Sequence, residues 1–170
     1  MTFPILRLTT LTLLLPALGS AQSAPHASPA DDSSFAAVKA RGGVVMGVDQ
    51  EASEHIFEDR TDGGRIVLRM KNAADTSGVM VIRRHLRATA DSFSLGVFRG
   101  PLEVHNMEVP GSAEMARRRG MIRYQAHDIA AGAEVVISST DSVAVAAIHA
   151  FLAFQRMDHH AAGHDSMHLP

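Results

Sequence analysis

The pattern that most constrains the fold occurs twice in this chain: two β-prone runs joined by a turn, followed by a stretch with helical periodicity. In the first instance, residues 55–58 and 65–70 flank Asp62-Gly63-Gly64. Glycines at such a position can take the positive φ that tight hairpin turns demand. This segment therefore predicts an antiparallel hairpin.

The same order recurs later in the chain. Residues 120–126 and 134–138 are β-prone, and the small residues 130–133 between them favour a turn. A second hairpin is expected here.

A helix is predicted after each hairpin. Asp75 or Thr76 can cap the first helix, which should stop near Gly96, and Thr140 or Asp141 can cap the second. The residues that share one face at helical spacing are Val79, Ile82, Leu86, Ala90 and Phe93 in the first helix, and Ala144, Ile148, Phe151, Leu152 and Gln155 in the second.

These elements predict an α+β fold: an antiparallel sheet of about four to six strands with two long helices on one face. The ββα–ββα order fits an internal duplication, and it equally fits a coincidence of two similar units. A short helix at 34–41 and the apolar run 44–48 should add one element each. An irregular link is expected around 98–101 and 109–111.

The N-terminal residues 1–21 have the three parts of a secretory signal: a start with Arg7 as its only charge, an apolar stretch over 8–18, and the small residues Gly19 and Ala21. We expect cleavage after Ala21 and an exported protein, periplasmic or extracellular. The apolar stretch is shorter than the roughly 20 residues that span a bilayer, so no membrane span is expected.

The remaining chain divides into three predicted parts. Residues 22–34, rich in Ala, Ser, Pro and Asp, should form a disordered leader, residues 35–157 a single α+β domain, and residues 158–170 a flexible tail. Removing 21 of the 170 residues leaves 149, which suits one domain.

Composition excludes several functions. Without Arg7 the chain has 15 basic and 18 acidic residues, a formal charge of −3 with His neutral. The single basic run, Arg117-Arg118-Arg119, has no aromatic neighbours for base stacking, so no nucleic acid is expected. Cys is absent, which excludes disulfides, thiolate metal sites and cysteine nucleophiles.

Metal ligands are concentrated at the C-terminus. The chain holds ten His and nine Met, ligand types suited to copper, zinc or nickel. His159, His160, His164 and His168 lie in the tail beside Asp and Met residues, which predicts a chelating arm. The alternative is a solubilising terminus with incidental histidines.

Further candidate ligands lie in the domain. His55 begins the first hairpin, and His85 and His149 lie at the border of the two helical stripes, where related helices could bring them together. His105 and Met107 would share one side of an extended segment. The alternative is that these are ordinary surface or core residues, with Met107 filling the core.

We therefore expect an exported protein that binds a transition metal, with copper favoured over zinc, for storage, delivery or tolerance. The rival hypothesis is a structural or small-ligand-binding module. The sequence leaves open whether a haem or organic ligand uses the same histidines, and whether the site lies within one chain or in a homodimer. No Gly-x-Ser-x-Gly elbow, phosphate loop or His-Glu-x-x-His motif indicates an enzyme.

The chain resembles a group of small exported bacterial proteins without an established function. The resemblance covers about residues 44–159. The motifs that carry it are Met46-Gly47-Val48-Asp49-Gln50, His55-x-Phe57, Asp62-Gly63-Gly64-x-Ile66, Ile82-Arg83-Arg84-His85-Leu86, Pro101-x-x-x-His105, Val109-Pro110-Gly111 and the run from Ala147 to Gln155. Some proteins of this group are called carbamoyltransferases. This chain is far shorter than that enzyme and lacks its Ser-Thr-Arg-Thr segment.

Overall fold

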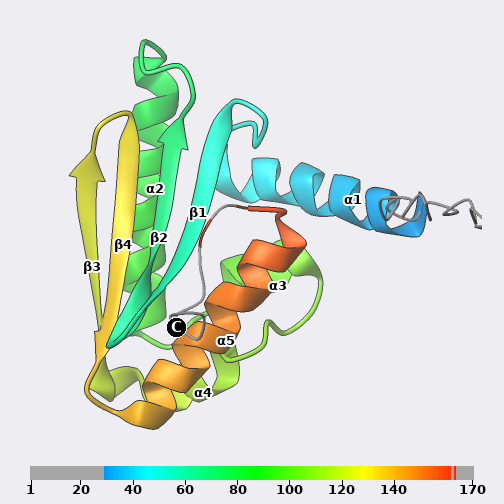
Figure 1. Cartoon of the computed structure of the whole chain (residues 1–170). Helices are drawn as coiled ribbons and strands as arrows, with labels where there is room; N and C mark the ends of the chain where they lie inside the picture. The colour runs from blue at the N-terminus through cyan, green and yellow to red at the C-terminus, as the bar shows by residue number, and fades with distance from the viewer. Residues whose placement is uncertain (1–28, 162, 164–170) are drawn as a thin grey trace, which may run out of the picture.

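The computed structural model describes residues 29–161 and 163, which form a four-stranded antiparallel sheet and five α-helices (Figure 1). The elements, in chain order, are α1 (Pro29–Met46), β1 (Ser53–Arg60), β2 (Gly63–Met70), α2 (Thr76–Ser94), α3 (Arg99–His105), α4 (Ser112–Arg117), the short 3-10 helix η1 (Arg119–Met121), β3 (Ile122–Ile129), β4 (Gly132–Ser139) and α5 (Ser142–Asp158). The predicted α+β class and antiparallel sheet are confirmed.

The sheet has the strand order β1-β2-β4-β3, so the second strands of the two hairpins pair with each other at its centre. Both hairpins close through two-residue turns, with Arg60 paired to Gly63 and Ile129 paired to Gly132. Gly63 has φ +147, and a Cβ there would lie 2.2 Å from the carbonyl oxygen of Ile137 on β4. The glycine thus permits the close approach of β4 at the end of the first turn.

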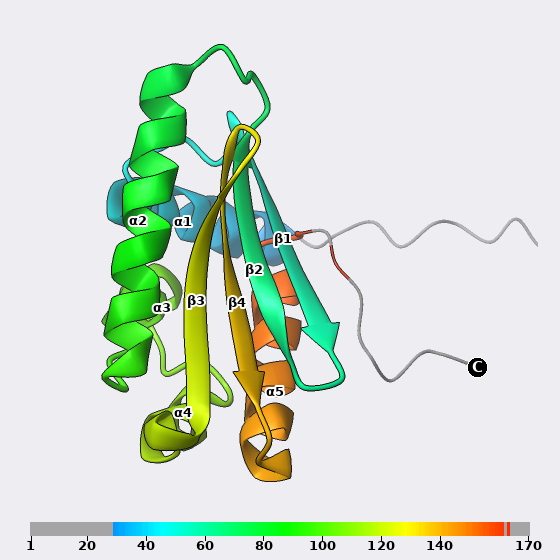
Figure 2. The ribbon, with the colours of Figure 1, turned by 90° about the vertical axis from the view of Figure 1, so that its left-hand side faces the viewer.

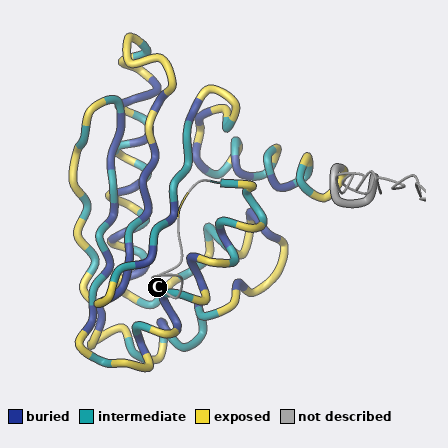
Figure 3. The backbone as a smooth tube through the Cα atoms, in the orientation of Figure 1, coloured by how far each residue is buried: buried dark blue, intermediate teal, exposed yellow. Residues whose placement is uncertain are grey.

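Both α2 and α5 pack on the same face of the sheet. Helix α5 lies over β1 and β2, while α2 lies over β3 and β4, and the rings of Phe93 and Phe151 meet edge to face with centroids 5.7 Å apart. The buried residues run along the inner faces of these elements (Figure 3). The fully buried side chains of this core include Ile82, Leu86, Val135, Ile137, Ile148, Phe151 and Leu152.

The opposite face of the sheet is the one towards the viewer in Figure 2. Charged side chains of β1, β2 and β4 pair across it. Arg65 on β2 forms ion pairs with Glu58 on β1 and, at 3.3 Å, with Glu134 on β4. Val67, two residues along β2 on the same face, is only 4% exposed. The inner face of β2 carries the buried Ile66, Leu68 and Met70, whereas its outer face combines the buried Val67 with charged residues.

Helices α2 and α5 begin as their capping residues predict. The carboxylate of Asp75 accepts a hydrogen bond from the backbone N–H of Gly78 at 2.9 Å, and Asp141 accepts one from Ala144 at 2.8 Å. Gly96, with φ +76, follows the end of α2 as predicted. Side-chain acceptors at these positions satisfy N–H groups that the first turn of a helix leaves unpaired.

One side chain from each of these helices holds the turn of the hairpin beneath it. Arg83 on α2 donates to the carbonyl oxygens of Ile129 and Gly132, at 3.0 and 3.1 Å. His149 on α5 has Nε2 2.9 Å from the carbonyl oxygens of both Arg60 and Gly63. Because a carbonyl oxygen only accepts, Nε2 of His149 carries a proton and donates it.

Several sequence predictions need correction. One helix of 18 residues, α1, replaces the short helix at 34–41 and the separate run at 44–48, so three helices are long. It begins at Pro29, so residues 29–34 are helical instead of belonging to a disordered leader. The expected irregular link contains α3 and α4.

The signal at 1–21, most of the leader and the tail histidines His164 and His168 lie outside the described residues. Within the described part of the chain, no helix is long and apolar enough to cross a membrane.

Replacement of His149 tests its role at the β1–β2 turn. We expect His149→Ala to lower the free energy of unfolding by about 1 to 2 kcal/mol, because two carbonyl oxygens lose their donor. His149→Arg should lose less of this free energy, since Arg83 forms a similar pair of hydrogen bonds at the β3–β4 turn. Urea denaturation of both variants measures the difference, and equal losses would contradict this role.

Candidate functional site

The described part of the chain has a half-open cavity of about 100 Å³ between the first hairpin and α1, α2, α3 and α5, and four of its lining residues are histidines. We call it the histidine cavity: His55 comes from β1, His85 from α2, His105 from the end of α3 and His159 from the end of α5. The other walls are mainly apolar, and they include Met46, Phe57, Leu68, Phe93, Val104 and Phe151. Residues spread over more than one hundred positions of the chain thus meet in one small space.

The local structure explains how each histidine reaches the cavity. His55 lies two residues before the core residue Phe57 on β1, so both side chains lie on the helix-covered face. His105 is the last residue of α3, and Asn106 after it has the left-handed φ of 55° that ends the helix. His159 caps the C-terminus of α5, one turn after the buried Gln155.

His105 is held on both sides of its ring. Its Nδ1 lies 2.5 Å from Oδ2 of Asp158, and its Nε2 lies 3.1 Å from Oε1 of Gln155. The side chain of His105 is 1% exposed, and Gln155 is 4% exposed. A carboxylate behind one nitrogen of a buried imidazole fixes the orientation of the ring.

His159 connects the other rings. Its centroid lies 5.0 Å from that of His105, at an interplanar angle of 89°, and 5.6 Å from that of His55. Its Nδ1 is buried and has no hydrogen-bond partner among the described residues. A buried polar atom without a partner costs free energy, and this nitrogen is a candidate contact for a ligand.

Burial lowers the pKa of His55, His85 and His159 and so favours their neutral forms. It lowers the pKa of His159 to about 3, with the neighbouring His55 and His105 adding to the effect. Burial also lowers the pKa of His55 to about 4, assisted by the charges of His85 and Lys71, and it lowers the pKa of His85. Nε2 of His55 lies 3.2 Å from the hydroxyl of Ser53. Neutral imidazoles offer a lone pair to a metal ion or to a hydrogen-bond donor.

The rings do not form a finished metal site as they stand. Within residues 29–161 and 163, no group of three or more His, Asp or Glu side chains is placed to hold a metal ion. Ligand nitrogens would therefore have to turn towards a common point before three of them could share one ion.

The structure separates the histidines and methionine predicted as ligands. His55, His85, His105 and His159 meet in one cavity, while His149 is bound to the β1–β2 turn and does not line it. The expected meeting of His85 with His149 at this site is therefore wrong.

The extended conformation expected around His105 and Met107 is also wrong. His105 ends a helix and is buried, whereas Met107 is 48% exposed. His160 lies outside the cavity, in a neighbouring pocket. His164 and His168 are outside the described residues.

Sequence reasoning missed the polar partners of the site. Gln155 was expected on the buried face of its helix, and a polar amide on an apolar stripe is a signal that it has a polar partner. Asp158 was assigned to the tail, although it is the last residue of α5. Nothing in the sequence alone indicates its contact with His105, 53 residues away.

Comparisons with known protein families, with curated proteins and with solved structures find no match to this chain. The resemblance to small exported bacterial proteins therefore stays a prediction. The function has to be argued from the histidine cavity itself.

The lowered pKa values predict a loss of stability in acid. In the unfolded chain the histidine pKa values are near 6.5, so it takes up protons at a higher pH than the folded chain does. The contribution of neutral His55 and His159 to the free energy of unfolding is therefore complete above pH 6.5. It is lost as the pH falls towards 4 and 3. His159→Phe keeps a ring of similar size but cannot titrate. This variant should reduce the slope with which the free energy of unfolding falls with pH by up to about 1.4 kcal/mol per pH unit.

Urea denaturation between pH 7 and 4 measures this slope. His127→Ala, at an exposed position of β3, serves as the control and should leave the slope unchanged. An unaltered slope in His159→Phe would contradict the buried, neutral state of His159.

Proposed function

We propose that the histidine cavity binds a single transition-metal ion, copper in preference to zinc, with His55, His105 and His159 as ligands. The protein would be exported, as residues 1–21 predict, and would serve storage, delivery or tolerance of the metal. The observation that carries the proposal is the spacing of the three rings. His159 lies between the other two, with its centroid 5.0 Å from His105 and 5.6 Å from His55.

This spacing suits a shared ion. Metal–imidazole bonds are about 2.0–2.1 Å long, and in a tetrahedral site two such rings have centroids roughly 5 Å apart. The ring of His159 is therefore at a suitable separation from each of the other two, although the ligand nitrogens do not yet face a common point. Rotation of the His55 and His159 side chains, with displacement of Gln155 from Nε2 of His105, would direct the nitrogens to one point.

The chemical state of the imidazoles also supports a metal. Metal ions bind the neutral form, and the low pKa values of His55 and His159 remove competition from protons at neutral pH. Asp158 stands behind His105 as carboxylates commonly stand behind metal-bound histidines. The unpartnered Nδ1 of His159 would gain a partner.

Copper is favoured by the thioether of Met46. This residue of α1 is 6% exposed and lines the same cavity. Thioethers are soft ligands that select Cu(I), while zinc prefers nitrogen, oxygen and thiolate donors. We therefore expect Cu(I) to bind more tightly than Zn(II).

Competition titration with Cu(I) and a chromophoric chelator tests the site. The chain should bind one ion in the cavity. His105→Ala and His159→Ala should each lower the affinity for Cu(I) by more than about tenfold. Asp158→Asn should lower this affinity by about 10- to 100-fold, the range seen when a carboxylate behind a ligand is lost. His149→Ala is the matched control, because it removes a histidine that lies outside the cavity.

The tail is tested in the same titration by replacing His164 and His168 with Ala. Cavity binding should survive this change. If all metal affinity disappears with the tail histidines, or if the cavity variants bind as tightly as the unchanged chain, the proposed site is wrong.

The dependence of binding on pH separates the cavity from the tail. Exposed histidines, with pKa values near 6.5, lose metal as the pH falls through 6. Two of the cavity ligands, His55 and His159, stay neutral to lower pH, since the pKa of His55 is about 4 and that of His159 about 3. The high-affinity ion should therefore remain bound at pH 5. Its release near pH 6.5 would place it on exposed histidines.

A small organic ligand is the second candidate, and the mainly apolar walls of the cavity favour it. Neutral imidazoles would then exchange hydrogen bonds with a polar group of that ligand. A thermal-shift series with phenol and benzoate distinguishes the candidates: stabilisation by these probes, together with indifference to Cu(I), would support the organic ligand.

We also infer that the two ββα units derive from one ancestral unit. Strands β1 and β3 begin at residues 53 and 122, and β2 and β4 at residues 63 and 132, an offset of 69 in both cases. The capping residues Asp75 and Asp141 differ by 66, as do the turn-holding residues Arg83 and His149.

If the duplication occurred, His55 and His85 of the first ββα unit have no histidine counterparts in the second unit. An offset of 69 relates His55 to Tyr124, and an offset of 66 relates His85 to Phe151. The counterparts of these two histidines are thus aromatic residues, which pack around Phe93 with centroids 5.9 and 5.7 Å away. The second half would have kept its rings for packing only.

A further inference from the structure

A second, larger hollow adjoins the histidine cavity. This outer pocket has a volume of about 300 Å³ and lies between α1, β1 and the residues that follow α5. It shares Gln50, His55 and His159 with the cavity, so these side chains form the wall between the two. Its remaining lining is largely polar, in contrast to the apolar cavity.

His160 stands on the other side of this wall from the cavity. Its φ of 47° is left-handed, and the backbone N–H of Ala161 donates to the carbonyl oxygen of Arg156 at 3.0 Å, which closes the end of α5. His159 therefore lines both hollows, while the adjacent His160 lines the outer pocket alone. The chain presents two consecutive imidazoles to two adjoining spaces.

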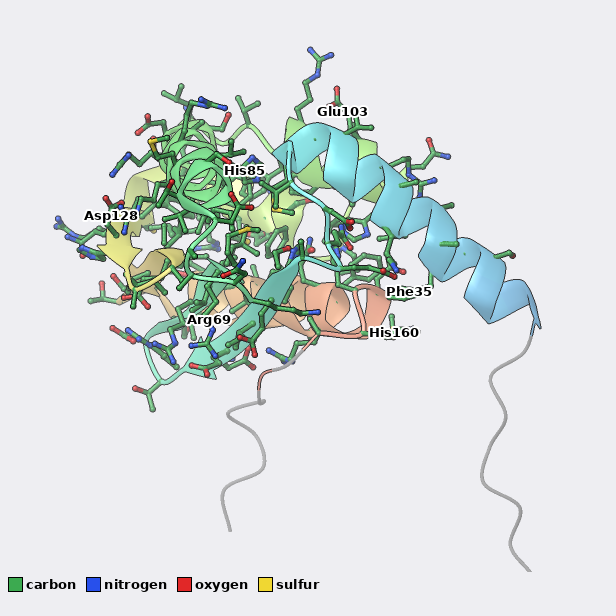
Figure 4. All side chains as sticks on the ribbon, turned by 90° about the horizontal axis from the view of Figure 1, so that it is seen from above. Phe35, Arg69, His85, Glu103, Asp128 and His160 are labelled. Carbon is green, nitrogen blue, oxygen red and sulfur yellow. The ribbon has the colours of Figure 1, made fainter. Side chains whose placement is uncertain are left out.

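Phe35 of α1 keeps the ring of His160 in place. The two rings stack with centroids 4.1 Å apart and an interplanar angle of 6°, and Figure 4 shows them side by side near the end of α5. Lys39, one turn further along α1, has its Nζ 5.6 Å from the centroid of the Phe35 ring. An exposed histidine just beyond the end of a helix would otherwise have considerable freedom, so this stack holds an imidazole at the outer pocket.

Charge in the outer pocket is balanced. Lys39 pairs with Glu51, and Lys71 donates to the backbone carbonyl of Glu51 at 2.8 Å. Glu54 pairs with Arg69. Each carboxylate of the pocket already has a cationic partner, so net charge attracts a metal ion only weakly. Binding there would have to come from a direct ligand.

We propose that the outer pocket is the entry route to the histidine cavity and that His160 is the first ligand a metal ion meets there, before His159 and His55 take it inward. This inference rests on the proposed function of the cavity. Ligand exchange between neighbouring imidazoles needs no fully desolvated ion at any point, because one nitrogen can bind before another releases. His160 would thus set the rate of uptake and not the affinity.

Stopped-flow uptake of Cu(I), followed by competition with a chromophoric chelator, tests the route. The full chain carries His164→Ala and His168→Ala throughout, so that these histidines cannot replace His160. In this background His160→Ala should slow both association and release by about tenfold and leave the equilibrium affinity unchanged, since an entry ligand alters both rates equally. Phe35→Ala, which keeps the imidazole but removes its stacking partner, should give a smaller change in the same direction.

His127→Ala is the control and should leave both rates unchanged. Equal rates with and without His160 would overturn the entry route while leaving the cavity site intact. A weaker equilibrium affinity in His160→Ala would also overturn it, because His160 would then be a permanent ligand. Absence of cavity binding in the unchanged chain would instead overturn the proposed function, and the entry route with it.

Discussion

The antiparallel pairing of β2 with β4 is the contact on which the rest of the structure depends. It joins two hairpins, each closed by a two-residue turn, into one sheet with a single continuous inner face. Helix α2 can then cover the second hairpin and α5 the first, with Arg83 and His149 holding the turns below them. The apolar side chains of both helices share one core because the hairpins share one sheet.

The histidine cavity is a consequence of this arrangement. It lies on the first hairpin beside α5, where α1 and α3 close the remaining sides. Enclosure among apolar residues makes protonation of His55 and His159 unfavourable, and it leaves Nδ1 of His159 without a partner. Free energy is thereby stored in groups that a ligand can satisfy, which is typical of binding sites and unusual in a core that only packs.

Local patterns in the sequence predicted much of the fold. The buried faces of α2 and α5, their Asp caps and the position of Gly96 follow from spacing and from the chemistry of helix ends, which act over a few residues. The extent of α1 and the helical link of α3 and α4 did not follow, because Gly42 and Gly43 interrupt the first pattern and the link is too short for clear periodicity. The histidines of the site were identified as residue types, but not as a group.

The sequence by itself determined the hairpin-and-helix units, the absence of cysteine chemistry and the supply of imidazoles. Only the tertiary structure decided which imidazoles meet. It bonded His149 to a turn, left Met107 exposed and brought His105 to Asp158 and Gln155 across about fifty residues of chain. Secondary structure depends on neighbours in sequence, whereas the cavity depends on strand order and on which helix covers which hairpin, and short-range patterns carry no information on those contacts.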